Sequence, residues 1–180
     1  MNALSRHIVL TGFMGAGKTT VARALAARLG CAMLDTDDRI VERGGRSIEA
    51  IINADGEARF RQIETEVLRD ILEHHDPRVI ALGGGTWTIE ANRVLIAARD
   101  CLTVWLDAPF ALCWQRIANA PGARPLARDR SQAQALYTAR RVVYEFAAWH
   151  LRAGAERSAE DMAAEIASII ERRSFAEERT

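Results

Sequence analysis

Short apolar runs alternate with longer stretches of helical periodicity along most of the 180-residue chain. The apolar runs predict strands at about 7–11, 31–34, 79–82, 101–106 and 150–153. Apolar residues at helical spacing predict helices at about 19–29, 36–44, 47–52, 57–74, 89–99, 109–118, 130–147 and 159–173. Apolar strands that alternate with helices are typical of a parallel sheet covered on both faces. The pattern therefore predicts an α/β fold of three layers around a five-stranded parallel sheet.

The chain is short enough for one domain and long enough to bury a substantial core. No repeat, low-complexity segment or interdomain linker interrupts the pattern. We expect residues 1–173 to form a single domain and residues 174–180 to form a frayed polar tail.

Polar residues at the strand ends are candidates for helix caps. Thr36 or Asp37 is the expected N-cap of the helix that ends near Gly44. Asp107 precedes Ala108-Pro109 at another helix start, so we expect a cap there too, although an Asp after an apolar strand also suits a metal. The segment 158–161 resembles a capping box.

The charge balance excludes several partner classes. Lys and Arg together number 24, and so do Asp and Glu, so no global field attracts nucleic acid or a membrane surface. No apolar run approaches the roughly 20 residues of a membrane span, and the polar start has no signal-peptide core. Cys31, Cys101 and Cys113 lack metal-like spacing, and we interpret them as reduced core residues. We therefore expect a cytoplasmic protein.

The stretch from Gly12 to Thr20 carries the strongest chemical signal. It follows an apolar strand, precedes a helix and matches G-x-x-x-x-G-K-[ST], the P-loop that binds nucleoside triphosphates. Lys18 would reach the outer phosphates, and the Thr19 hydroxyl would bind Mg²⁺. A chance glycine-rich turn is the alternative, but the flanking elements argue against it. The candidate nucleotide-binding residues here are Gly15, Ala16, Gly17, Lys18, Thr19 and Thr20.

Other candidates lie where neighbouring strands end, which is where ligands bind in such sheets. Asp35 and Asp37 follow the second strand, so one could serve Mg²⁺ and the other could hold a substrate hydroxyl. The alternative is that Asp37 or Asp38 simply caps the next helix. Gly83-Gly84-Gly85 follows the third strand and would let the backbone approach a ligand closely, unless it is an ordinary turn.

Several arginines could bind anionic groups. Arg61 and Glu64 stand at i, i+3 on a predicted helix, where the carboxylate would hold the guanidinium for a bidentate grip on a substrate carboxylate. A surface ion pair is the alternative. Arg140 shares a helix face with Tyr144, unless that face is merely solvated. The segment 119–129 has the composition of a lid over phosphates, with Arg124 as its cation, or of a plain solvated loop.

Taken together, these motifs resemble the shikimate kinase family over nearly the whole chain. The matching motifs are Gly12 to Thr20, Asp35-Thr36-Asp37, Ser47-Ile48, Gly56 to Glu64, Gly83 to Gly85, Arg124-Pro125-Leu126 and Arg140 to Tyr144. The P-loop alone is shared by many nucleotide enzymes, whereas the ordered set is specific. The resemblance implies the nucleoside-monophosphate-kinase-like fold, with sheet order 2-3-1-4-5. It also implies transfer of the ATP γ-phosphate to the 3-hydroxyl of shikimate, with Mg²⁺ as cofactor.

The resemblance also implies roles for individual residues. Asp37 would hold the acceptor hydroxyl and act as a base, and Thr19 with Asp35 would serve Mg²⁺. Lys18 and Arg124 would stabilise the phosphates, and Arg157 would contact adenine. Residues of about 36–75 would form the substrate-binding helices. The shikimate-binding residues would be Asp37, Arg61, Gly83, Gly84, Gly85 and Arg140. The expected partners are ATP and shikimate, without nucleic acid or membrane, and the expected state is a monomer.

Four departures from the family pattern concern the acceptor more than the chemistry. Ala127 stands where a second leucine is usual, and Trp87 is bulkier than the residues common after the glycines. Ile52 replaces a frequent aromatic, and the segment Arg141-Val142-Val143 lacks the proline that is often found before the tyrosine. A related small-metabolite kinase with another hydroxyl acceptor therefore remains an alternative, as does a sensing module that has lost transfer. Against the sensing module stand the intact Lys18, Thr19, Asp35, Asp37 and Arg124.

Overall fold

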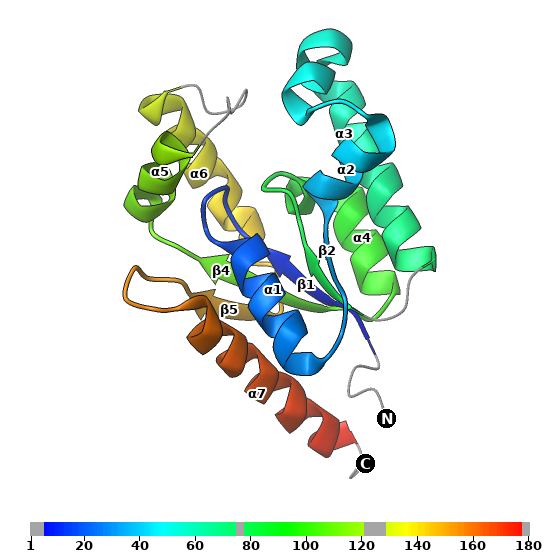
Figure 1. Cartoon of the computed structure of the whole chain (residues 1–180), viewed down its shortest axis with the longest axis vertical. Coiled ribbons are helices and arrows are strands. Elements are labelled where there is room, and N and C mark those ends of the chain that lie inside the picture. Colours follow the sequence, from blue (N-terminus) through cyan, green and yellow to red (C-terminus); the bar gives the residue numbers. More distant parts are fainter. Residues whose placement is uncertain (1–5, 75–77, 121–128, 178–180) are drawn as a thin grey trace.

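The computed structural model describes residues 6–74, 78–120 and 129–177. Within this part of the chain the strands form one parallel sheet (Figure 1) in the order β2-β3-β1-β4-β5. The strands are β1 (Ile8–Thr11), β2 (Met33–Asp35), β3 (Val79–Ala81), β4 (Leu102–Asp107) and β5 (Trp149–Arg152). The predicted sheet and its order are confirmed.

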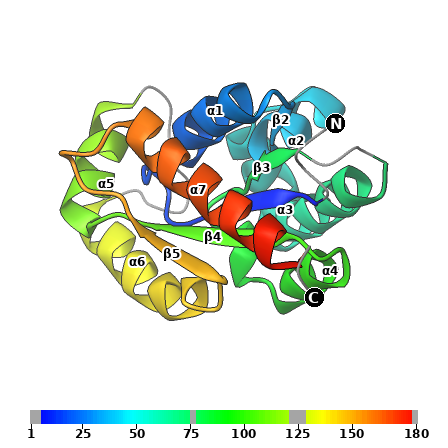
Figure 2. The same cartoon turned by 90° about the horizontal axis from the view of Figure 1, so that it is seen from below.

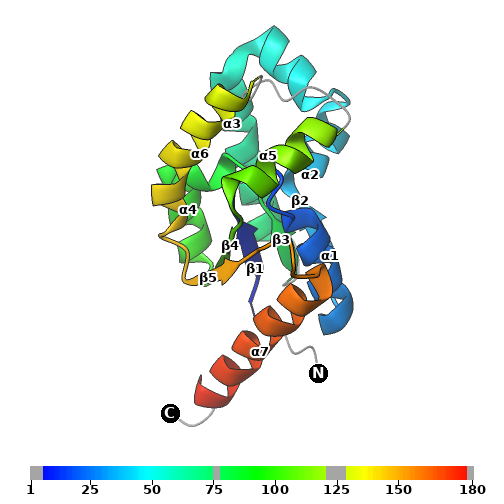
Figure 3. The same cartoon turned by 90° about the vertical axis from the view of Figure 1, so that its left-hand side faces the viewer.

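Helices cover both faces of the sheet, as Figures 2 and 3 show. On one face lie α1 (Lys18–Leu29) and α7 (Ala159–Glu177), which pack against each other. On the other face lie α3 (Ile48–His74), α4 (Glu90–Ala98) and α6 (Arg130–Tyr144). The shorter helices α2 (Thr36–Gly44) and α5 (Phe110–Asn119) follow the carboxyl ends of β2 and β4. The three-layer α/β architecture is therefore confirmed.

The core lies along the central strands. Ile8, Val9 and Leu10 of β1 have no exposed surface, because α1 and the helices of the opposite face bury both sides of this strand. Burial of one such aliphatic side chain stabilises the fold by about 1.5–3 kcal/mol. The central strands consequently hold the segments at their carboxyl ends in fixed positions.

The cap of α2 differs from the prediction. Asp35, the last residue of β2, is the N-cap, and its Oδ1 accepts a hydrogen bond from the backbone N of Asp37 at 2.9 Å. Thr36 and Asp37 are already inside the helix. Asp35 fills this position because its backbone is still extended, as an N-cap requires.

The predicted cap of α5 is also wrong, since Pro109 precedes its first residue and no side chain caps it. Asp107 instead forms two hydrogen bonds, of 2.8 and 3.1 Å, with the guanidinium of Arg141 on α6. The capping box at the start of α7 is confirmed, because Ser158 and Asp161 each donate a backbone N–H to the other's side chain.

Three further boundaries refine the sequence-based picture. Both predicted helices from 48 to 74 lie in α3, which is kinked at Gly56, whose φ is 85°. Helix α6 ends at Tyr144 rather than near residue 147, and α7 continues to Glu177, into the predicted tail. Arg124 and residues 121–128 of the predicted lid lie outside the described residues. No helix in the described part is long and apolar enough to cross a membrane.

Candidate active site

The P-loop joins β1 to α1 at the carboxyl edge of the sheet (Figure 1). Position 15 requires glycine for two reasons. Its φ is +77°, and a Cβ there would lie 2.7 Å from the carbonyl oxygen of Cys113. No side chain caps the start of α1, where Gly17 is the N-cap. The first N–H groups of this helix therefore remain available to an anion, as the motif predicts.

Lys18 is held at the base of the loop. Its ammonium donates hydrogen bonds of 2.9 Å to the carbonyl oxygens of Gly12 and Phe13. Burial lowers the pKa of Lys18, and the carboxylates of Asp37 and Asp35 oppose this shift. The loop backbone thus fixes a desolvated cation between the phosphate cradle and the two acids.

Thr19 and Asp35 come together as predicted for a metal pair. The Thr19 hydroxyl donates to Asp35 Oδ2 at 2.6 Å, while Asp35 Oδ1 accepts from the backbone of α2. A hydroxyl and a carboxylate are oxygen ligands of the kind Mg²⁺ takes beside nucleotide phosphates. The described residues contain no cluster of three or more His, Cys, Asp or Glu that could hold a metal ion. The pair fits a metal that shares its coordination with substrate and water.

A cavity of about 480 Å³ opens in front of the P-loop. Its size suits a small-molecule ligand. It brings together most of the predicted P-loop residues with residues from four other segments. The polar and glycine residues of its wall are Gly15, Gly17, Lys18, Thr19, Thr20, Asp35, Asp37, Gly84, Arg116 and Arg157. Ala16 does not line it; its side chain is buried, and its N–H donates to Phe13 O.

Arg116 is a cavity residue that the sequence analysis did not single out. Its guanidinium donates to the carbonyl oxygen of Gly15 at 3.0 Å from the last turn of α5. Arg157 lines the same cavity from the segment before α7, and its guanidinium donates hydrogen bonds to Arg152 O and to Glu165. The only sequence signal for Arg116 was its place beside the arginine-rich segment, because no motif contains it.

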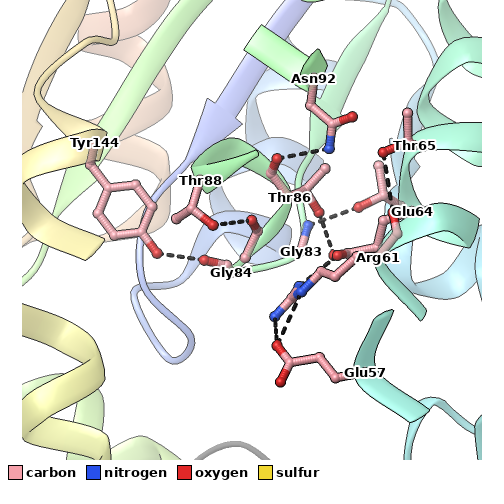
Figure 4. Close-up of polar contacts among 12 residues, drawn as sticks. Glu57, Arg61, Glu64, Thr65, Gly83, Gly84, Thr86, Thr88, Asn92 and Tyr144 are labelled. Atoms are coloured by element: carbon pink, nitrogen blue, oxygen red, sulfur yellow. Dashed lines mark hydrogen bonds and ion pairs between the residues drawn. The ribbon is translucent and has the colours of Figure 1, made fainter. Parts of the chain in front are cut away.

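On the acceptor side, carboxylates hold Arg61 (Figure 4). Its Nη1 donates to Glu64 at 2.5 Å and its Nη2 to Glu57 at 2.9 Å. Glu64 is only 1% exposed, so this is not the surface ion pair that the sequence left open. Burial acts to lower the pKa of Arg61, but the charges and hydrogen bonds of Glu64 and Glu57 outweigh it and leave that pKa raised.

Arg140 and Tyr144 share a buried face of α6, which rules out the solvated alternative. Burial lowers the pKa of Arg140, the neighbouring Tyr144 hydroxyl acts in the opposite sense, and the positive charge of Arg61 lowers this pKa further. Burial raises the pKa of the Tyr144 hydroxyl, which donates to the carbonyl oxygen of Gly84 at 2.5 Å (Figure 4). Among the described residues, no carboxylate lies within ion-pair distance of Arg140.

The glycine segment lies where the two sides meet. A Cβ at Gly83 would overlap Asp37 Oδ1, and one at Gly85 would overlap the Arg61 guanidinium. Gly84 lies between the P-loop and α6, since a Cβ there would be 3.2 Å from Met14 N and 3.7 Å from Arg140 Nη1. Thr36, which the sequence analysis considered only as a helix cap and as part of the Asp35-Thr36-Asp37 motif, accepts a hydrogen bond from Gly83 N at 2.8 Å. The segment is therefore a close-approach site rather than an ordinary turn.

This fold and site define a P-loop kinase, in which a phosphate cradle lies close to cationic side chains from other helices. The shikimate kinase family model matches residues 14–171. A shikimate kinase from Ruegeria pomeroyi is 41% identical over 163 residues, which cover 89% of this chain and 82% of that protein. One from Geobacter sulfurreducens is 41% identical over 168 residues, covering 92% and 91%. The chain belongs to the shikimate kinase family, and it is an ATP-dependent kinase.

A solved structure agrees with the sequence relatives. The shikimate kinase from Acinetobacter baumannii in complex with shikimate superimposes with a TM-score of 0.86 at 34% identity, covering 93% of this chain and 94% of that one. The expected nucleoside-monophosphate-kinase-like fold is thereby confirmed.

Proposed function

We propose that this chain transfers the γ-phosphate of ATP to the 3-hydroxyl of shikimate, giving shikimate 3-phosphate and ADP. This step belongs to the chorismate route of aromatic amino-acid biosynthesis. The observation that carries the proposal is Arg140, which is 7% exposed and lies near Arg61 without an ion-paired carboxylate in the described part of the chain. A buried cation in this state is stabilised when a ligand carboxylate completes its pairing.

The two arginines suit the carboxylate of shikimate. Arg61 is oriented by Glu64 and Glu57, and Arg140 approaches from a different helix. A planar carboxylate has two oxygens, so each arginine can hold one of them. Gly83 to Gly85 carry no Cβ atoms, so the guanidinium groups of Arg61 and Arg140 can lie close to this backbone.

Asp37 is proposed to hold the reacting hydroxyl. It lines the same cavity as the P-loop, and its charge acts on Lys18. The 3-hydroxyl oxygen would form a bond to the γ-phosphorus while the bond from that phosphorus to the β-phosphate oxygen breaks. Asp37 would accept the hydrogen bond of the hydroxyl and take up its proton.

The donor side would hold the nucleotide through backbone and cations. The N–H groups from Gly15 to Thr20 and the Lys18 ammonium would bind phosphates, and Thr19 with Asp35 would hold Mg²⁺. The ion would neutralise phosphate charge when bound. Arg157 would contact the adenine, and Arg116 lines the same cavity. Arg124, outside the described residues, is proposed to stabilise the transferred phosphate.

We further propose a monomeric cytoplasmic enzyme without nucleic-acid or membrane partners. The three free cysteines suit a reducing compartment. The equal numbers of basic and acidic residues provide no global field for an anionic polymer or surface. Gel filtration with light scattering tests the monomer directly.

A coupled ADP-release assay tests the function. We expect turnover with shikimate and none with gluconate or nucleoside monophosphates, loss of activity when EDTA replaces Mg²⁺, and a phosphate on the 3-oxygen by NMR. Turnover with another acceptor alone would identify a related small-metabolite kinase. Absence of turnover with every acceptor would identify a sensing module.

A further inference from the structure

The short 3-10 helix η1 (Thr86–Thr88) directly follows the glycine segment and contacts both arginine-bearing helices. On one side, the Thr86 hydroxyl donates to Glu64 Oε1 on α3 at 2.6 Å. On the other, the Trp87 indole N–H donates to the carbonyl oxygen of Val143 on α6 at 3.0 Å. The single turn of η1 therefore connects Glu64, which binds Arg61, to α6, which carries Arg140.

The Thr86 side of this junction acts on Arg61 through Glu64. Thr86 is fully buried and Glu64 is 1% exposed, so each polar atom needs a protein partner. Glu64 divides its two oxygens: Oε1 accepts from Thr86, and Oε2 accepts from Arg61 (Figure 4). Without the Thr86 donor, the Glu64 carboxylate would lose the bond that fixes its rotation and with it the direction of the Arg61 guanidinium.

The Trp87 side acts on the helix that carries Arg140. The indole is 3% exposed and bonds to α6 only three residues beyond Arg140. Tyr144 makes a second link in the opposite direction, from α6 back to Gly84 O (Figure 4). In the sequence analysis, the large side chain of Trp87 was a reason to doubt the identity of the acceptor. In the structure this side chain attaches α6 to η1.

Helix α4 holds η1 itself in place. The Asn92 amide donates to Thr86 O at 2.9 Å, and the Arg93 guanidinium donates to Trp87 O at 2.8 Å. Asn92 is fully buried, so the first of these bonds is shielded from water. Because these bonds hold η1 in place, it can keep α3 and α6 at a fixed separation.

We propose that η1 is a spacer that sets the separation of Arg61 and Arg140, and that Thr86 and Trp87 are positioning residues for recognition of the acceptor carboxylate. The inference rests on the proposed function. It predicts that these two residues control how strongly the enzyme prefers an ionised carboxylate, while they leave the handling of ATP untouched.

The test compares shikimate with its methyl ester, which keeps the hydroxyls and lacks the negative charge. In the parent enzyme kcat/KM should be higher for shikimate. Thr86→Val keeps the side-chain shape and removes the donor, so it should raise KM for shikimate about tenfold. It should change kcat, KM for ATP and kcat/KM for the ester by less than about twofold. Thr86→Ser should restore the preference, and Trp87→Phe should reduce it as Thr86→Val does.

Thr65→Val is the matched control, because the Thr65 hydroxyl donates only to the backbone of its own helix, at Arg61 O. It should leave the preference unchanged. Equal losses for shikimate and ester in Thr86→Val, or an unchanged preference in both Thr86→Val and Trp87→Phe, would overturn the inference alone. Absence of shikimate turnover by the parent enzyme would overturn the proposed function and the inference with it. If Thr86→Val does not fold, the preference for shikimate over its ester is measured in Trp87→Phe and Thr86→Ser instead. A reduced preference in Trp87→Phe with a normal one in Thr86→Ser supports the inference, and an unchanged preference in Trp87→Phe overturns it.

Discussion

The donor and acceptor halves of this active site place their cations in different ways. In the donor half, one continuous stretch from Gly12 to Thr20 supplies the loop, a cation and the proposed metal ligand Thr19, and Lys18 is held by carbonyl oxygens of that same stretch. In the acceptor half, Asp37, Arg61 and Arg140 come from three helices. Their positions depend on tertiary contacts through the glycine segment and η1.

This difference determines what a substitution can disturb. The P-loop residues of the donor half are neighbours in the sequence, so their relative geometry is local. Acceptor residues are connected through buried hydrogen bonds such as Thr86 to Glu64, where one lost donor can reorient a distant group. Acceptor affinity should therefore be more easily changed by distant substitutions than nucleotide affinity.

The largest effect should come from the residue at the boundary of the two halves. Asp37→Asn should lower kcat by at least about 10²-fold, because the amide cannot take up the proton of the acceptor hydroxyl. Steady-state kinetics with both substrates measures it. Asp38→Asn, a change of the exposed neighbour, serves as the control and should stay within about twofold. A near-normal kcat in Asp37→Asn would refute the role of that carboxylate.

The second largest effect should change the affinity for one substrate and leave the affinity for the other unchanged. Arg140→Ala should raise KM for shikimate about 10- to 100-fold, since it removes charge-assisted hydrogen bonds to a non-reacting group. KM for ATP should hardly change. Arg141→Ala is the matched control on the next residue, whose guanidinium pairs with Asp107. Equal affinity for shikimate in Arg140→Ala and the parent would exclude the carboxylate assignment.

A third change tests the close approach of the backbone. Gly85→Ala should raise KM for shikimate about tenfold, because the new methyl group would displace the Arg61 guanidinium. Backbone strain does not enter, since φ at Gly85 is −107°. Gly44→Ala, where a Cβ would meet Ile51 at an ordinary 3.9 Å, is the control. Calorimetric titration with shikimate measures the dissociation constants of both variants, which should follow the change in KM. Identical dissociation constants in Gly85→Ala and the parent would show that the Arg61 guanidinium can move aside without weakening shikimate binding.

The same contrast explains what could be predicted from sequence. Periodicity and glycine placement were sufficient for most of the strands and helices and for the P-loop, because these are local patterns. The order of the strands came from the family resemblance, since periodicity does not show which strands pair. The cap of α2 was misassigned because Asp35, Thr36 and Asp37 are all good capping residues, and only the backbone conformation distinguishes them. Arg116 was missed because its partner, Gly15, lies 101 residues away. The link from Thr86 to Glu64 likewise spans 22 residues and has no motif.

The smallest effect concerns Asp107, the acid that rivals Asp35 as a metal ligand by sequence. Asp107→Asn should change the free energy of unfolding by no more than about 1 kcal/mol, because its partner Arg141 has a side chain 42% exposed and such pairs contribute little. Thermal denaturation measures this change. Activity should stay within about twofold.

The Mg²⁺ requirement decides between the two acids. Asp35 bonds to Thr19 of the P-loop, whereas Asp107 points to Arg141 on the far side of β4 and lines a different cavity, so only the first can reach a nucleotide-bound ion. Asp35→Asn should therefore raise the Mg²⁺ concentration needed for half-maximal activity, and Asp107→Asn should not. The reverse result would move the metal from the end of β2 to the end of β4. The metal would then depend on a strand much farther along the chain from the P-loop than β2 is.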